Sequence, residues 1–105
     1  RFNTKTFKLF NSICPQSVAH FRSLFSDHID NDIVVTDIYP MPTSITYVFS
    51  DGIELSIIGT STLEQWYVET RRLTADEYIT DVQVSMYNPR TGEIIEDNNY
   101  FLNKV

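Results

Sequence analysis

The residue types that carry most enzyme chemistry are scarce in this chain, which has one cysteine, Cys14, and two histidines, His20 and His28. Cys14 and His20 lie six residues apart, about 600° around a helix, so the imidazole does not face the thiol as a general base would. The two histidines lie eight residues apart, whereas zinc-binding helices use spacings of about three to five residues. We therefore predict that the protein is not an enzyme and that it has no catalytic residue, metal site or cofactor.

Carboxylates are the most abundant reactive groups, and they are distributed unevenly. The chain has 14 acidic and 8 basic residues, for a net charge of −6. Residues 1–26 contain four bases and no acid, whereas residues 27–105 contain all 14 acids and the other four bases, which gives +4 against −10. The acidic portion repels nucleic-acid phosphates. We expect a protein partner with a basic surface and no direct nucleic-acid contact, although a basic helix lying against an acidic sheet would explain the same pattern.

The densest acidic stretch includes Asp27, Asp30, Asp32 and Asp37. A calcium loop needs oxygen ligands at alternating positions and a glycine at its sharp bend. The segment Asp30-Asn31-Asp32 lacks both a third ligand and the glycine. The preferred interpretation is a solvated turn between a helix and a strand.

Length and composition limit the class of protein. A chain of 105 residues with 42% hydrophobic and 21% charged residues is typical of one globular domain, here predicted over residues 1–105. The lone Cys14 excludes an internal disulfide, and this is typical of a reducing compartment, so we expect a cytoplasmic protein. No run of about 18 apolar residues occurs, and no membrane span is expected.

A hairpin around Asp51-Gly52 is the clearest structural element, because Asp-Gly between alternating runs is a strong hairpin signal. A two-residue loop would place aromatic and aliphatic residues of one strand opposite polar residues of the other. A three-residue loop, Ser50-Asp51-Gly52, makes one face apolar, and we predict it, with Gly52 in the left-handed region. The residues expected to face the core are Ile45, Tyr47, Phe49, Ile53, Leu55 and Ile57, and those expected to face outward are Thr46, Val48, Glu54 and Ser56.

Apolar residues at helical spacing after Pro15 predict an amphipathic helix over residues 15–28. The pattern of residues 2–12 is compatible with a helix and with a strand, and it does not decide between these two alternatives. Residues 63–72 also fit both, and their density of Trp, Tyr, Val and Thr favours a strand. Pro40 is expected to end the strand before it, because proline cannot donate to a sheet ladder. The predicted strands are 33–39, 44–49, 53–58, 63–72, 81–87 and 93–97, with a short edge over 100–105.

These elements predict an α+β fold, in which one N-terminal amphipathic helix packs on an antiparallel meander of five to six strands. Residues 74–77 are expected to form a turn or one helical turn. Residues 88–93 are expected to form a second hairpin turn, with Gly92 at the left-handed position.

Tyrosines beside acids are the strongest sign of a binding surface. On the strand interpretation, Tyr67 and Tyr87 point opposite to Trp66 and Met86 and leave the core face. Tyrosine has an apolar ring and a polar tip, which suits protein interfaces. The candidate interaction residues are Tyr67, Glu69, Asp81, Tyr87, Glu93, Glu96 and Asp97.

The preferred function is a small, acidic, non-enzymatic protein-interaction module. A special case is an inhibitor that mimics nucleic acid and binds a basic protein surface. One alternative is a ligand-binding or hydrolytic cup between the helix and a curved sheet. Another is a structural subunit that forms a homo-oligomer through an open sheet edge.

Overall fold

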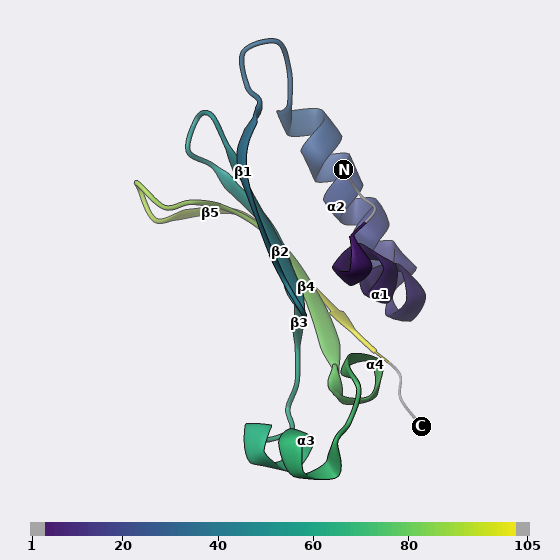
Figure 1. Cartoon of the computed structure of the whole chain (residues 1–105). Coiled ribbons are helices and arrows are strands. Elements are labelled where there is room, and N and C mark those ends of the chain that lie inside the picture. Colours follow the sequence, from purple (N-terminus) through teal and green to yellow (C-terminus); the bar gives the residue numbers. More distant parts are fainter. Residues whose placement is uncertain (1–3, 103–105) are drawn as a thin grey trace.

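Two layers make up the fold, a pair of N-terminal helices and a five-stranded antiparallel sheet (Figure 1). The computed structural model describes residues 4–102. Strand order in the sheet is β1-β2-β3-β4-β5, so the predicted meander and the α+β class are confirmed. The elements are α1 (Lys5–Ile13), α2 (Pro15–His28), β1 (Val35–Met41), β2 (Ser44–Phe49), β3 (Glu54–Thr60), α3 (Gln65–Arg71), α4 (Ala75–Tyr78), β4 (Asp81–Asn88) and β5 (Glu93–Phe101).

The N-terminal layer contains two helices where one was expected. Helix α2 has the predicted bounds, and α1 occupies residues that fitted both a helix and a strand. Thr4 caps α1, since its side chain accepts a hydrogen bond from Phe7 N at 3.2 Å. Cys14 separates the helices, and Pro15 begins α2, where a missing N–H costs nothing.

The β2–β3 hairpin has the predicted three-residue loop. Gly52 has φ +90°, and Phe49 N donates to Ile53 O at 2.9 Å. Tyr47 pairs with Leu55 in the register, as expected. Gly92 also has the expected positive φ, at +80°. The six residues predicted to face the core are all buried.

The prediction that Pro40 ends its strand was wrong, because β1 continues to Met41. Gly59 N donates to Thr43 O, so odd-numbered residues of β2 direct their backbone groups toward β3 and even-numbered ones toward β1. The partner of Thr46 in β1 is Tyr39. The neighbouring Pro40 therefore faces away from β2, and its missing N–H removes no ladder bond.

The strand predicted over residues 63–72 was also wrong. Thr60 pairs directly with Asp81, so β3 and β4 are neighbours and leave no place between them for another strand. The connection forms α3 and α4 instead, and Figure 1 shows α3 beyond the end of the sheet. High β-propensity did not decide this segment, because only Val68 in α3 is buried and little packing depends on the rest.

The last strand is longer than expected, and it is continuous. Strand β5 runs from Glu93 to Phe101, where a strand over 93–97 and a separate edge were predicted. Its register shifts once, since Met86 pairs with Glu96 but Tyr87 pairs with Ile94. This irregularity is a β-bulge, and in Figure 1 the tip of the β4–β5 hairpin points away from the helices. The part of the predicted edge beyond residue 102 lies outside the described residues.

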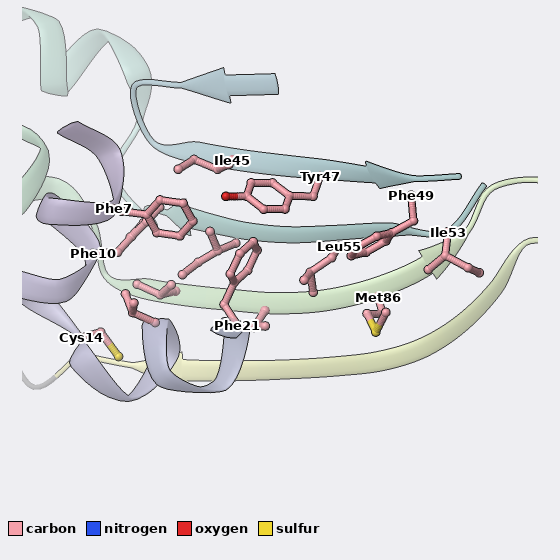
Figure 2. Packing of buried hydrophobic residues seen from close by; sticks show 14 of the residues in the cluster. Phe7, Phe10, Cys14, Phe21, Ile45, Tyr47, Phe49, Ile53, Leu55 and Met86 are labelled. Carbon is pink, nitrogen blue, oxygen red and sulfur yellow. The ribbon is translucent and has the colours of Figure 1, made fainter. Parts of the chain in front are cut away.

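Aromatic side chains fill the space between the two layers (Figure 2). The Phe21 ring centroid lies 5.2 Å from that of Phe7 and 5.3 Å from that of Tyr47, both edge to face. Phe25 also meets Tyr47 at 5.4 Å. Burial raises the pKa of the Tyr47 phenol above its ordinary value. This side of the sheet is therefore committed to the core.

Candidate interaction surface

The opposite face of the sheet is not covered by α1 or α2 (Figure 1), and we call it the outer face. Alternation along the strands and the cross-strand register assign its residues. One row runs Asp37, Val48, Glu54 and Tyr87, from β1 to β4. Its charged and exposed apolar residues are Asp37, Glu54, Asp81, Asp97, Tyr39, Met41, Tyr87, Ile94 and Phe101.

Charge on the sheet has a single sign. The five strands contain six Asp or Glu residues and no Lys or Arg. Four of these acids, Asp37, Glu54, Asp81 and Asp97, belong to the outer face. Neighbouring strands lie about 4.8 Å apart, which puts Asp37 and Glu54 about 10 Å apart across the sheet. The basic residues Lys5 and Lys8 belong to the helical layer instead.

Two of the four outer-face carboxylates accept hydrogen bonds from uncharged hydroxyl and amide groups. Asp97 Oδ1 accepts a hydrogen bond from the Gln83 side-chain amide on the neighbouring strand. Asp81 Oδ1 accepts from the hydroxyls of Thr60 and Thr80. Within residues 4–102, none of the four outer-face acids forms an ion pair with Lys or Arg. No Lys or Arg side chain within residues 4–102 therefore offsets their negative charge.

Large apolar side chains lie among these acids. Phe101 is 77% exposed, Met41 58% and Tyr39 55%. Aromatic and methionine side chains are typical of protein interfaces, where they supply a large apolar contact area. The outer face therefore combines negative charge with exposed large apolar side chains.

The seven candidate residues do not form one surface. Asp81, Tyr87 and Asp97 share the outer face, whereas Glu96 points to the other side of β5. Glu93 begins β5 opposite Asn88, beside the hairpin turn.

Tyr67 and Glu69 belong to α3 and not to the sheet, which follows from the wrong strand prediction there. The Arg71 guanidinium lies 5.3 Å from the centroid of the Tyr67 ring. Glu69 accepts a hydrogen bond from the Gln65 side chain at 3.2 Å, within the same helix. Both side chains are thus engaged locally on α3.

The sequence interpretation missed Asp37 and Tyr39 on the outer face. Both alternate with Ile38 along β1, and this alternation was the signal that would have identified them. Glu54 was placed outward but was not counted as a site residue. Its partners Val48 and Tyr87 show that it lies in the middle of an outer-face row.

A polar cluster on the covered side joins β5 to α2. His20 Nδ1 and the Tyr100 hydroxyl lie 2.9 Å apart, although the residues are 80 positions apart in sequence. His20 Nε2 is 3.9 Å from Glu96 Oε1, which also accepts from the Asn98 side-chain amide at 2.9 Å. No local sequence pattern connects these residues. The cluster fastens β5, at one side of the sheet, to the helical layer.

The contacts of Cys14 and His28 indicate structural roles for both residues. Cys14 is a buried free thiol where α1 meets α2. His28 Nε2 lies 2.9 Å from Asp51 Oδ2, and its ring lies 4.6 Å from that of Phe49. The histidine thus connects the end of α2 to the β2–β3 loop.

The side-chain carboxylate of Asp30 stabilises the acidic turn that follows α2. Asp30 Oδ1 accepts from the backbone N–H groups of Asp32 and Ile33, both at 2.8 Å. Among the described residues, no group of three or more His, Cys, Asp or Glu side chains is placed to hold a metal ion.

A hollow of about 430 Å³ lies between α1, the β1–β2 turn and α4. Its lining is mostly apolar, with Lys5 and Asp76 as the charged groups. The space between α2 and the sheet, where a ligand cup was an alternative, contains the rings of Phe21, Phe25 and Tyr47. The hollow therefore does not lie at the position predicted for the ligand cup. The ligand-binding cup stays a prediction.

Across residues 4–102, none of the helices combines the length and the apolar character that crossing a membrane requires. Comparisons of the chain with protein-family models, curated proteins and solved structures give no match.

Proposed function

We propose that this protein is a small, non-enzymatic interaction module whose acidic outer face binds a basic surface of another protein. One observation carries the proposal. The sheet face that the helices leave uncovered presents four carboxylates and exposed aromatic rings, and none of the five strands contains a basic residue. A partner with clustered Lys and Arg would complement this surface in charge.

Two physical effects support such a partner. The single-signed face attracts a basic protein over about one Debye length, near 10 Å at 0.1 M salt, and so raises the association rate. Burial of Tyr39, Met41 and Phe101, which are exposed in the free protein, then stabilises the complex. Charge would set the encounter and the orientation, and the apolar residues would slow dissociation.

An inhibitor that presents carboxylates in place of phosphates to a nucleic-acid-binding protein is a special case of this function. The uninterrupted negative charge of the strands supports it. The lone, buried Cys14 fits a reducing compartment, so the proposal places the interaction in the cytoplasm.

The test is a quantitative pull-down from the native cell extract with three forms of the protein. The first is the wild type, and the second is Asp37→Asn/Glu54→Gln/Asp97→Asn, which removes three outer-face charges. The third, Asp27→Asn/Asp32→Asn/Glu69→Gln, is a control that removes three exposed charges outside the sheet.

A specific partner should be retained by the wild type and the control at about 50 mM NaCl and released at about 500 mM. The outer-face variant should retain less than about a tenth of it. Equal retention by the outer-face variant, or a complex insensitive to salt, would contradict the proposal. The partner recovered would then be purified, and calorimetry with the same three forms would measure its affinity.

A further inference from the structure

The sheet has two lateral edges, β1 and β5, and they differ in what they offer to an added strand. Along β1, Pro40 faces away from β2 and has no N–H to donate. The register of β1 also shifts between Val35 and Asp37. Proline and bulges are two of the devices that discourage edge pairing in natural sheets. The β1 edge is therefore protected.

The β5 edge has neither device over residues 96–101. Leu102 N donates to Thr80 O at 2.9 Å, so the even-numbered residues of this stretch direct their backbone groups toward β4. The odd-numbered residues direct theirs away from β4, and among residues 4–102 no other strand pairs with that side. The residues with outward-facing N–H and C=O groups are Asp97, Asn99 and Phe101.

Side chains along this edge define the chemistry of the strand that would fit. Asp97 and Phe101 lie on the outer face and Glu96 on the other, so carboxylates flank the free backbone on both sides. Phe101 is 77% exposed and lies four residues from Asp97. Because alternate residues share a face, a paired strand needs a base opposite Asp97 and, four residues along, a large apolar residue opposite Phe101.

A second copy of the chain fits this edge poorly. The antiparallel register with the largest overlap centres on Asp97 and sets this carboxylate opposite its own copy. Like charges directly opposite one another destabilise strand pairing. Since β5 contains three acids and no base, a basic segment complements it better than β5 itself does.

We propose that an extended, basic segment of the partner protein adds to β5 as a sixth strand of the sheet. This inference rests on the proposed function and names the mode of binding. The added strand would satisfy the outward-facing groups of Asp97, Asn99 and Phe101 and place Lys or Arg beside the two carboxylates. Backbone hydrogen bonds would supply affinity, and the base and the apolar residue four positions apart would supply specificity.

The probe is a seven-residue peptide, acetyl-KRTTVFT-amide, used together with its reversed sequence because the added strand has two orientations. A control peptide of the same charge has proline in place of the central threonine, and this prevents strand pairing. Nuclear magnetic resonance would report binding to the full chain and the exchange protection of each amide. The variants are Asn99→Pro, which removes an outward-facing donor as Pro40 does in β1, and Asp97→Lys, which reverses the charge and keeps the backbone donor.

One orientation should bind and protect the amides of Asp97, Asn99 and Phe101, and the proline peptide should not bind. Asn99→Pro should weaken binding about fivefold through one lost hydrogen bond, and Asp97→Lys about tenfold or more. Asp97→Lys carries the test if Asn99→Pro does not fold. Absence of binding at about 1 mM peptide, protection elsewhere, or protection of these amides by self-association would overturn the inference. If Asn99→Pro retains the extract partner and the outer-face variant loses it, the edge proposal fails and the proposed function stands.

Discussion

The two faces of this sheet are built from the same strands, residue by residue, yet they have opposite properties. Between Ile45 and Tyr47, which are buried, lies Thr46, which is hydrogen-bonded to Ser56 on the outer face at 2.9 Å. The inner face is apolar and closed by aromatic rings, whereas the outer face is acidic and uncovered. In the proposed function, stability depends on one face of the sheet and recognition on the other, because alternate residues of a strand point to opposite faces. Substitutions on the two faces should affect different measurements.

The largest expected effect is on the inner face. Phe21→Ala removes a fully buried ring that packs against Phe7 and Tyr47, and the free energy of unfolding should fall by about 3–5 kcal/mol. Urea denaturation followed by circular dichroism would measure the change. The control Ser85→Ala on the outer face should change it by less than about 0.5 kcal/mol. Similar losses from the two variants would remove the distinction between the faces.

A smaller loss is expected at Gly59, where the inner face has little room for a side chain. A Cβ at Gly59 would lie 2.8 Å from Ile79 Cδ1 and 3.1 Å from Phe10 Cε1, so Gly59→Ala should cost about 1–3 kcal/mol. Adding Ile79→Val removes the closer methyl group and should recover part of that loss. Thermal unfolding of both variants would test this. If Gly59→Ala does not change the stability, the neighbouring core side chains can shift to make room for the added methyl group.

The buried phenol of Tyr47 makes the inner face sensitive to high pH. Its pKa is raised by burial, so well below pH 10 the phenol is protonated in the folded and the unfolded chain. As the pH rises further, the unfolded chain loses this proton first, and the free energy of unfolding falls. Tyr47→Phe should therefore lose less stability between about pH 9 and about pH 11. Urea titrations at the two pH values would measure it, and equal losses would show that Tyr47 does not contribute.

The smallest effect on stability is expected on the outer face. Glu54→Gln removes a charge that has no cationic partner among the described residues, so unfolding should change by less than about 0.5 kcal/mol. Partner retention at low salt should nevertheless fall. A variant that destabilises the fold by more than about 2 kcal/mol would mean that the outer face also supports the structure.

The sequence predicted the parts of the fold that depend on local alternation and turns. The register of the β2–β3 hairpin followed from Gly52 and the matching of apolar residues, and the helix over 15–28 followed from its periodicity. The segment 63–72 was misassigned because tertiary pairing of Thr60 with Asp81, and not the propensity of its residues, decides its conformation.

The candidate surface was predictable only in part. Asp81, Tyr87 and Asp97 were among the predicted interaction residues and lie on the outer face, whereas Asp37 was considered only as part of the acidic stretch after the helix. The contact of His20 with Tyr100 joins residues 80 positions apart, and one sequence has no signal for such a pair. The sequence therefore did not predict which residues from distant segments lie side by side in the fold.

Carbodiimide labelling of carboxylates, read by mass spectrometry in the free protein and in its complex with the extract partner, tests whether the partner covers the outer face. We expect Asp37, Glu54 and Asp97 to lose reactivity in the complex, because the partner would cover the outer face. Asp27 and Asp32, which lie outside the sheet, should react equally in both states. Protection of Asp27 and Asp32 with unchanged labelling of the outer-face acids would show that the partner binds elsewhere.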